Sequence, residues 1–334
     1  MTIKDLAALT GYSIGTVSRA LNGHPHVSPK ARIAILDAAK KHGFQFNPNA
    51  KNLKQQRSNA IIAVVKGTSN ELFGSLIEVI QTLVSRTPYA LVVDYIDEDA
   101  NEVRRAASLC REKKPRGVLF LGGNQDNFRS DFCEIDVPSV LVTNSAQQLA
   151  FENLSSVTSD DYQGGLLAVE HLASLGHRKF VVIGGNRQVS DITGLRYRGC
   201  MEGFKRNNIS FDEENGYEDI RFSYQDGYCA MKHLLERGAD FTALFAMADV
   251  IAIGAIRALR DAGKRVPEDV SVVGFDGLEI GTYAIPRLDT IVQDVEKLAS
   301  RSVQILLEQI RGETTCYHET IPVAVQWRES TRQV

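Results

Sequence analysis

The stretch TIKDLAALTGYSIGTVSRALN, residues 2–22, holds two short helical patterns separated by a turn. Thr2, followed three residues later by Asp5, resembles a capping box with Asp in place of the commoner Glu, and it predicts a helix over residues 3–10. Gly11 predicts the end of this helix, because glycine tolerates the left-handed conformation that follows many helices. The first pattern therefore predicts a short helix that stops at a turn.

A second helix is expected over residues 14–22, with Ser13 accepting a hydrogen bond from the amide of Thr16 at its start. At about 100° per residue, its apolar side chains gather on one side, and its small polar side chains gather on the other together with Arg19. Gly15 leaves this polar side without bulk. Such a helix can pack on its neighbours with one face and present the other face to a partner.

A third helix is expected from Ser28 to His42, with Ser28 as its cap and Pro29 at its first position, where a missing amide hydrogen costs nothing. Residues 1–59 hold nine Lys or Arg and two Asp, a net charge of +7, so the remainder holds 29 bases and 39 acids, a net charge of −10. A basic head on an acidic body is typical of a small nucleic-acid-binding domain. The alternative, a solvated basic tail, does not account for the apolar periodicity of the head.

Beyond residue 60 the pattern changes to short apolar runs, rich in β-branched residues, that alternate with helical stretches. This alternation predicts parallel sheets with crossover helices, and it restarts midway along the chain. We therefore expect an α/β body of two doubly wound lobes, with a ligand cleft at the carboxyl ends of their strands. The expected strands cover residues 60–65, 90–95, 117–122 and 139–144, and then 179–185, 242–248 and 270–276.

Other classes of protein find little support. The GGN turns at residues 122–124 and 184–186 do not match a dinucleotide-binding GxGxxG pattern, and no Walker loop occurs. Five cysteines without a CxxC pair favour reduced thiols in a cytoplasmic protein over a metal site or disulfides. No apolar run approaches the roughly 20 residues of a membrane helix, and no secretory signal is found at the start. We therefore expect no enzyme activity, metal, cofactor or membrane association.

The head resembles that of the lactose and galactose repressor (LacI/GalR) family of transcriptional regulators. TVSR at residues 16–19 and VSPKAR at residues 27–32 carry the match. The resemblance implies that Ile14, Gly15 and Arg19 are the base-reading positions. Arg19 can offer a bidentate fork to a guanine edge, whereas Gly15 departs from the family by leaving fewer direct contacts. The positions that match phosphate contacts are Thr2, Ser13, Thr16, Ser18, Asn22, His26 and Ser28.

Residues 43–59, GFQFNPNAKNLKQQRSN, resemble the hinge of the same family, with Phe46 in place of a proline. In the family this hinge becomes a short helix on DNA and inserts a leucine into the minor groove. Leu53 is therefore the expected wedge, which kinks the duplex and allows more phosphate contact. The plainer alternative for Leu53 is a buried linker residue. The expected hinge contacts to DNA are Asn47, Ala50, Lys51, Leu53 and Lys54.

The body resembles the effector domain of this family and periplasmic sugar-binding proteins, in which the chain crosses between the lobes three times. The matching stretches are residues 161–185, 196–199, 247–277, 290–294 and 328–331. The resemblance implies a division into four parts. These are a helix-turn-helix head at 1–46, a hinge at 47–59, a first lobe at 60–157 and 289–319, and a second lobe at 158–288 and 320–334.

The resemblance also assigns a small-molecule effector to the cleft. Carboxylates accept hydrogen bonds from hydroxyls, arginine donates two, and an aromatic ring covers a sugar face, so the expected contacts suit a polyol. Three of them have plainer alternatives: Asp249 as a helix cap, Asp276 as a solvated strand-end carboxylate and Phe222 as a core residue. The first-lobe contacts also depart from the family pattern, because Glu71 replaces a proline. The expected contacts are Leu72, Phe73, Asp161, Arg196, Phe222, Asp249 and Asp276.

The resemblance implies a cytoplasmic, homodimeric repressor that binds a palindromic DNA operator, since a two-fold dimer requires a two-fold site. Its effector is expected to be a sugar, with a purine or another small molecule as the alternative. The sequence is compatible with induction and with corepression. The alternative from another class is a cytoplasmic or periplasmic solute-binding protein without a regulatory role, against which the basic head argues.

Overall fold

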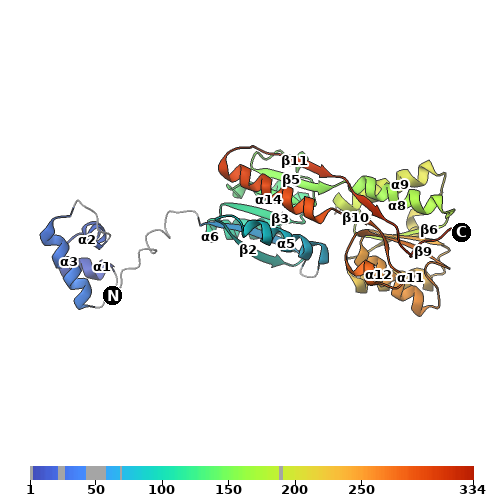
Figure 1. The fold of residues 1–334 in the computed structure, drawn as a ribbon, viewed down its shortest axis with the longest axis horizontal. Helices are drawn as coiled ribbons and strands as arrows, with labels where there is room; N and C mark the ends of the chain where they lie inside the picture. The colour runs from blue at the N-terminus through green and yellow to red at the C-terminus, as the bar shows by residue number, and fades with distance from the viewer. Residues whose placement is uncertain (1–2, 22–26, 43–57, 68–69, 188–190) are drawn as a thin grey trace. The chain divides into compact units, whose positions relative to one another are not determined.

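A computed structural model of the chain describes residues 3–21, 27–42, 58–67, 70–187 and 191–334 (Figure 1). The chain forms two units, Met1–Arg57 and Ser58–Val334, called here the head and the body. Several expected DNA contacts lie outside the described residues, namely Thr2, Asn22, His26, Asn47, Ala50, Lys51, Leu53 and Lys54.

The head contains three short helices, as the sequence predicts. The side chain of Ser13 accepts a hydrogen bond from the amide of Thr16 at 3.2 Å, and the side chain of Ser28 caps the third helix through the amide of Ala31 at 3.3 Å. Apolar side chains from all three helices form one small core, which includes Val17. The helices are α1 (Ile3–Thr10), α2 (Ile14–Leu21) and α3 (Pro29–Lys41).

The first lobe of the body is a six-stranded parallel sheet in the order β11-β5-β4-β3-β1-β2. Alternate residues of its central strands face two separate apolar clusters, one shared with α5 and α14 and the other with α6 and α7. Burial on both faces explains why β1, β3 and β4 are continuous apolar runs. The strands are β1 (Ala60–Lys66), β2 (Ala90–Ile96), β3 (Gly117–Leu121), β4 (Ser139–Val142), β5 (Leu154–Ser159) and β11 (His318–Ile321). The helices are α5 (Glu71–Val84), α6 (Glu102–Lys113), α7 (Gln125–Asp131), η1 (Phe132–Glu134), η2 (Gln147–Leu149) and α14 (Val295–Arg311).

The second lobe repeats this design with the order β12-β10-β9-β8-β6-β7, and β12 is antiparallel to β10. Helices α8 and α9 cover one face of the sheet, and α11 and α12 cover the other. The strands are β6 (Phe180–Gly184), β7 (Tyr217–Asp219), β8 (Ala243–Ala246), β9 (Ser271–Asp276), β10 (Asp289–Val292) and β12 (Ala324–Gln326). The helices are α8 (Asp161–Ser174), α9 (Asp191–Arg206), α10 (Glu213–Gly216), α11 (Tyr224–Glu236), α12 (Asp249–Asp261) and α13 (Ile280–Tyr283).

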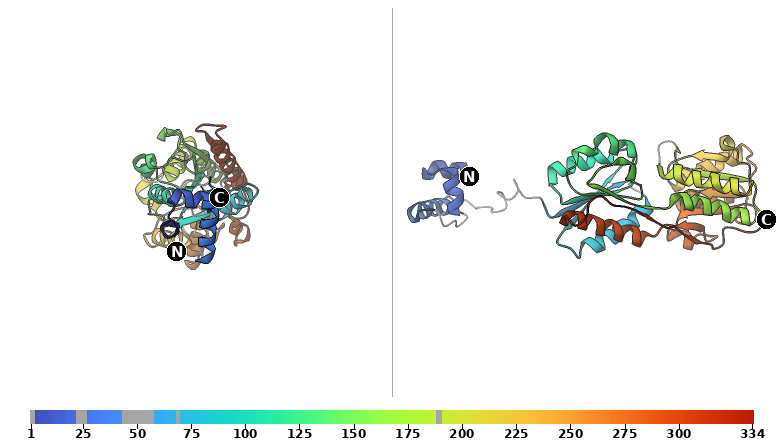
Figure 2. Two further views of the ribbon diagram at one scale, coloured as in Figure 1. Left: turned by 90° about the vertical axis from the view of Figure 1, so that its left-hand side faces the viewer. Right: turned by 90° about the horizontal axis from the view of Figure 1, so that it is seen from above.

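The chain passes between the two lobes after β5, after β10 and after β11 (Figure 2). These crossings lie a few residues beyond the boundaries expected from the sequence. The boundary at residue 289 is wrong because β10 still pairs with β9 of the second sheet, and the boundary at 320 is wrong because β11 pairs with β5 as far as Ile321. Likewise, β5 continues past the expected boundary at 157. A strand ends where its ladder of hydrogen bonds ends, and the apolar pattern alone does not reveal its partner.

Two helices of the second lobe approach each other closely through glycine. A Cβ atom at Gly165 of α8 would overlap the carbonyl oxygen of Arg196, and a Cβ atom at Gly199 of α9 would overlap that of Tyr162. Because the clashing atoms belong to the backbone, they cannot move aside without separating the helices. The glycines therefore set the distance between α8 and α9, which carry two of the expected effector residues.

We expect Gly199→Ala to lower the free energy of unfolding of the body by about 2 kcal/mol, as overpacking of a tight interface does. Urea unfolding followed by circular dichroism measures the change. Gly74→Ala on α5 is the matched control, because no atom lies within 4 Å of a Cβ built there. The control should be neutral or stabilising by up to about 1 kcal/mol. Equal stability of the two variants would contradict the role assigned to the glycine contact.

Candidate functional site

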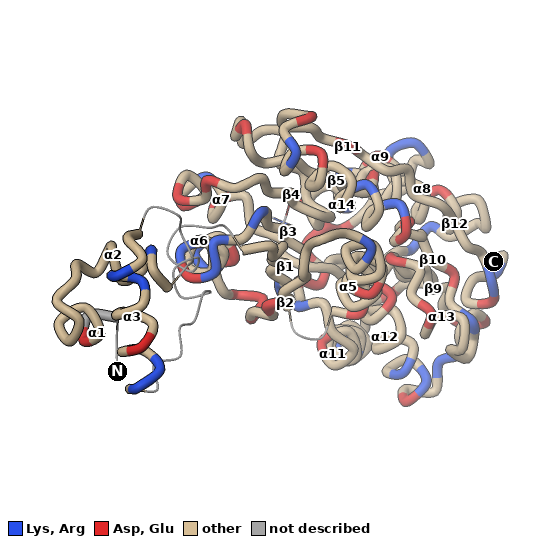
Figure 3. Tube along the Cα trace, turned by 60° about the vertical axis from the view of Figure 1, so that its left-hand side comes forward, with Lys and Arg blue, Asp and Glu red and all other residues tan. Residues whose placement is uncertain are grey.

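The second helix of the head has one buried and one open face. Val17 and Ala20 are buried in the head core, whereas Ile14 is 48% exposed and Arg19 is exposed on the opposite side. The Nε of Arg19 donates to the carbonyl oxygen of Gly15 at 3.2 Å. This is the two-faced helix predicted from the sequence, with its cation on the open face. In the described part of the head, α2 and α3 carry five Lys or Arg and one Asp (Figure 3).

Gly15 lies on this open face without a packing reason for being glycine. The nearest atoms to a Cβ built there are Arg19 Nη2 and Ser13 Oγ, both at 3.9 Å. Its φ is not in the left-handed region, so a side chain would not strain the backbone. Gly15 therefore leaves a bare patch on the surface that α2 offers to a partner.

The body contains a cleft of about 600 Å³ between its lobes. Phe73 from the first lobe and Phe222 from the second line this cleft among amide and charged side chains. Both GGN turns also line it, a role that the sequence analysis missed although the repeated motif was visible after two predicted strands. The lining residues are Lys66, Asn70, Phe73, Glu98, Asp99, Gly122, Gly123, Asn124, Asn127, Asn144, Gly185, Asn186, Ile192, Asp219, Ile220, Arg221 and Phe222.

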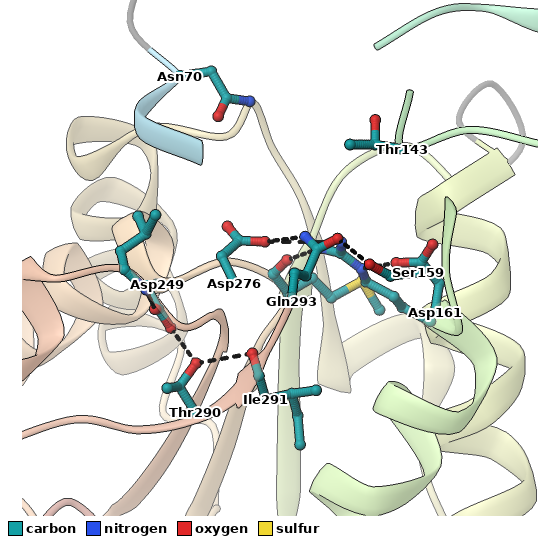
Figure 4. A network of polar contacts seen from close by, with 12 residues as sticks. Asn70, Thr143, Ser159, Asp161, Asp249, Asp276, Thr290, Ile291 and Gln293 are labelled. Carbon is teal, nitrogen blue, oxygen red and sulfur yellow. Dashed lines mark hydrogen bonds and ion pairs between the residues drawn. The ribbon is translucent and has the colours of Figure 1, made fainter. Parts of the chain in front are cut away.

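The other expected effector residues do not line this cleft. Leu72 is buried in the core of the first lobe beside Phe73. Asp161 borders a neighbouring cavity of about 390 Å³, and Arg196, Asp249 and Asp276 border neither of the two cavities. The structure nevertheless buries all four charged residues. Asp161, Arg196 and Asp276 share one polar network, and Asp249 belongs to a separate one with Thr290, which Figure 4 shows close to Asp276. We call this group of Asp161, Arg196, Asp249 and Asp276 the charged floor.

Arg196 organises the charged floor. Its Nε donates to Asp161 Oδ1 at 2.8 Å, its Nη1 donates to the carbonyl oxygen of Met247, and its Nη2 lies 3.9 Å from Asp276 Oδ1. Its guanidinium carbon also lies 3.5 Å from the ring centroid of Phe275. Burial raises the pKa of Asp161 and that of Asp276 to about 6, although the charge of Arg196 opposes both shifts.

Asp276 connects the charged floor to two of the crossings between the lobes. It ends β9 with a φ of +114°, a strained conformation for a residue with a side chain. Gln293 donates to Asp276 Oδ1 at 2.8 Å and accepts from the hydroxyl of Ser159 at 2.6 Å. Gln293 follows β10 and Ser159 ends β5, so this chain of hydrogen bonds spans two crossings. The alternative of a solvated strand-end carboxylate is therefore wrong.

Asp249 is the first residue of α12, but it does not cap that helix. Ala248 occupies the cap position, and the carboxylate of Asp249 accepts from the amide of Leu278 at 2.7 Å and from the hydroxyl of Thr290 at 2.6 Å. Burial, together with the nearby charge of Asp276, raises the pKa of Asp249 to about 8. The alternative that Phe222 is a core residue holds in part, because its side chain packs against the core clusters of the second lobe and also lines the cleft.

A buried ion pair fixes the first-lobe wall of the cleft. Glu102 is fully buried at the start of α6 and accepts from Lys66 Nζ at 2.6 Å. It also accepts from the amide of Asn124 at 2.6 Å and from the side chain of Asn127 at 2.9 Å. Glu102 thus fixes the positions of Lys66 and of the first GGN turn, both of which line the cleft. The sequence offered no sign of this role, because Glu102 follows a cap residue as many exposed acids do.

Polar contacts join the two lobes at the cleft. Arg221 of the second lobe pairs with Glu98 of the first at 2.7 Å and with its neighbour Asp99. The hydroxyl of Tyr224 donates to the carboxylate of Glu71 across the same gap. The partners are more than 100 residues apart in sequence, so the sequence analysis could not pair them. We call these contacts the latch, because each joins one lobe to the other.

Comparison with known proteins accounts for both units. Residues 2–49 match the family described as bacterial regulatory proteins, lacI family, and residues 169–331 match a periplasmic binding protein-like domain. The transcriptional regulator MalR of Clostridium butyricum is 32% identical over 337 residues, 99% of either chain. The structure of a CelR–cellobiose complex superposes on this chain with a TM-score of 0.74 at 29% sequence identity. The structure of a lac repressor dimer bound to operator and an anti-inducer superposes with a TM-score of 0.74 at 26% identity. Each comparison covers 99% of both chains.

A helix-turn-helix head joined to a two-lobed ligand-binding body defines a ligand-responsive transcriptional regulator. The chain belongs to the LacI family and is a sequence-specific DNA-binding protein of that class. Within the described residues, no helix has the length and apolar character needed to cross a membrane. The same residues bring together no group of three or more His, Cys, Asp or Glu that could hold a metal ion.

The raised pKa of Asp249 gives the body a defined pH dependence. A carboxyl whose pKa is higher in the folded than in the unfolded chain stabilises the fold at low pH, and this contribution is lost as the pH rises toward about 8. Between about pH 5 and 7, the contribution of Asp249 to the free energy of unfolding should fall by about 1.4 kcal/mol per pH unit, because its carboxyl keeps its proton in the folded chain and loses it in the unfolded chain. Asp249→Asn removes the titrating group, and the asparagine side chain can still donate to Thr290 and accept from Leu278.

The stability of Asp249→Asn relative to the wild type should therefore increase with pH, as measured by urea unfolding at several pH values. Asp269→Asn is the control, because the hydrogen bond from Arg265 lowers the pKa of that exposed carboxyl, so it does not titrate in this range. Parallel stability curves for Asp249→Asn and the wild type would show that Asp249 stays ionised in the folded body.

Proposed function

We propose that this regulator is a cytoplasmic repressor that binds a palindromic operator as a homodimer and responds to a small polyhydroxy effector in the cleft. The observation that carries the effector proposal is the cleft, which is lined by amides, charged groups and two phenylalanine rings. Hydroxyl groups can both donate to carboxylates and accept from amides, and an aromatic ring covers the apolar face of a sugar. The protein acts by binding, without catalysis.

For the head, we propose that α2 enters the major groove with Ile14, Gly15 and Arg19 toward the bases. Ser13, Thr16, Ser18 and Ser28, with Thr2, Asn22 and His26, would contact phosphates and fix the orientation of the helix. The hinge at residues 47–59 would add the Leu53 wedge, flanked by Lys51 and Lys54, with Asn47 and Ala50 in the positions that the family pattern requires. The exposed cation and bare surface on α2 support this arrangement.

For the effector, we propose that Phe73 and Phe222 cover the ring faces while Asp161, Arg196, Asp249 and Asp276 supply the deepest hydrogen bonds. Leu72 would support Phe73 from the first-lobe core. The complex of the relative CelR with cellobiose favours a sugar as the ligand class. Because the charged floor is buried, its residues would reach a ligand once the lobes rearrange around it.

For regulation, we propose that effector binding changes the angle between the lobes and so orders or melts the paired hinges. The latch supports this proposal, because its contacts join the two lobes, and Arg221, Glu98 and Asp99 line the cleft. A coupling free energy of about 1 to 3 kcal/mol would change operator affinity about 5- to 150-fold. Induction and corepression differ only in which lobe angle orders the hinges.

For assembly, we propose that the second copy packs on an apolar patch of the second lobe. Ile280, Tyr283 and Ile285 lie on or beside α13 and are 41%, 72% and 83% exposed. Large side chains this exposed and close together mark an interaction surface. The lac repressor relative, solved as a dimer on its operator, supports a copy of the same chain as the partner.

We expect Arg19→Met to weaken binding to the cognate operator by about 1 to 3 kcal/mol, roughly 5- to 150-fold, with little effect on unrelated DNA. Footprinting on the gene's own promoter region locates the operator, and fluorescence anisotropy at one fixed salt concentration measures both affinities. Lys40→Met at the end of α3, away from the proposed reading face, is the control and should change both affinities little. Equal losses on cognate and unrelated DNA would instead make Arg19 a phosphate contact.

The effector proposal is tested by thermal-shift screening against sugars and nucleobases, followed by calorimetry on the best ligand. A ligand at about 100 times its dissociation constant stabilises the body by about 2.7 kcal/mol. Asp276→Asn should weaken its binding by about 1.5 to 3 kcal/mol, the worth of a hydrogen bond to a charged group. Asp269→Asn, on the surface away from the cleft, should bind like the wild type. Unchanged affinity in Asp276→Asn would remove that carboxylate from the effector site.

A further inference from the structure

Three side chains at one edge of the first lobe form a cluster that neither the DNA-binding nor the effector proposal uses. The Sγ of Cys316 lies 3.0 Å from Nε2 of His318, and Nδ1 of the same imidazole lies 2.8 Å from Oγ of Ser156. Residues two apart on an extended chain point to the same side, which places Cys316 and His318 together. His318 of β11 is the register partner of Ser156 in β5, which completes the cluster.

The thiol of Cys316 has two acceptors within reach, Nε2 of His318 at 3.0 Å and the carbonyl oxygen of Leu154 at 2.9 Å, so transfer to the imidazole requires the thiol hydrogen to turn from the carbonyl toward Nε2. The Oγ of Ser156 accepts from the amide of Ala146 at 3.0 Å and has a second lone pair for an Nδ1–H donor. With the proton on Nδ1, the lone pair of Nε2 faces the thiol. After proton transfer, both imidazole N–H groups have acceptors, namely Ser156 Oγ and the Cys316 thiolate. The geometry matches the pairing of nucleophile, base and orienting group in thiol chemistry.

Burial favours the neutral form of both groups. Burial raises the pKa of the Cys316 thiol and lowers that of the His318 imidazole. A neutral imidazole can act as a base, so the thiol is activated when a reagent arrives and does not exist as a standing ion pair. Both residues are half-buried.

The other cysteines differ in these respects. Cys200 is fully buried, Cys110 is half-buried with a pKa that burial raises to about 11, and Cys133 and Cys229 are exposed. Within the described residues, no hydrogen bond to a histidine is recorded for Cys133, and the partner of Cys229 is the side-chain amide of Gln225. Exposure alone would therefore make Cys133 and Cys229 the more reactive thiols, whereas base assistance would favour Cys316.

We propose that Cys316 is a modification site for hydroperoxides, with His318 as its general base and Ser156 as the residue that orients the imidazole. The thiol proton moves to Nε2, and the sulfur attacks one oxygen of hydrogen peroxide. An S–O bond forms as the O–O bond breaks, and the departing hydroxide takes the proton from the imidazolium to give water. The sulfur is oxidised by two electrons to a sulfenic acid, and the peroxide is reduced.

The test is residue-resolved oxidation of the full-length protein by dilute hydrogen peroxide, with dimedone capture of sulfenic acids and peptide mass spectrometry. General-base catalysis contributes about 10²-fold or more when fully effective, so Cys316 should react at least about tenfold faster than Cys133 in the same molecule. His318→Gln should lower the rate at Cys316 to that of Cys133 and leave Cys133 unchanged.

The comparison between cysteines in the wild type needs no variant, so it stands even if His318→Gln is unstable. Thermal unfolding shows whether the variant is folded, and dimedone omitted from a parallel sample measures the background. Oxidation of Cys316 no faster than that of Cys133, or an unchanged rate at Cys316 in folded His318→Gln, would overturn the proposal. Because oxidation is measured without DNA or effector, its result is independent of the proposed repressor function.

Discussion

The buried guanidinium of Arg196 is the interaction on which the organisation of the body depends. It contacts α8 through Asp161, the end of β8 through Met247 and the end of β9 through Asp276. A buried cation requires paired acceptors, because an unpaired charge in the interior costs several kcal/mol. Three elements of the second lobe must therefore end at one point. The glycine contact between α8 and α9 brings the arginine within reach of its first carboxylate.

The same network connects the charged floor to the crossings between the lobes. Asp276 contacts Gln293 after β10, and Gln293 contacts Ser159 at the end of β5, so two of the three passages between the lobes share one line of hydrogen bonds. A change in hydrogen bonding at the floor would thus reach the segments that connect the two lobes. The latch lies elsewhere, between Arg221 and the acids after β2 and between Tyr224 and Glu71, so polar contacts join the lobes both at the crossings and across the cleft.

The sequence predicted those parts of the molecule that depend on local patterns. Caps and apolar periodicity located the three head helices, and apolar runs located β1, β3 and β4, because these strands are buried on both faces. It missed β5, whose sequence LSSVTS is polar although every residue is buried, since its serines bond to neighbours distant in sequence. It also missed Glu102 and Arg221, whose roles come from partners that only the fold brings near. The resemblance supplied the charged floor, but the structure showed how its members are joined.

Gly15 has a consequence for the history of such regulators. Its position on α2 has room for a Cβ atom, whose nearest neighbours among the described residues would lie at 3.9 Å. Gene copies that diverge after duplication can therefore change the open face of α2 by one codon change that leaves every residue of the body as it was. The surface of the DNA-binding head and the ligand-binding body can therefore change separately, and a glycine is the simplest starting point for a new side chain on that surface.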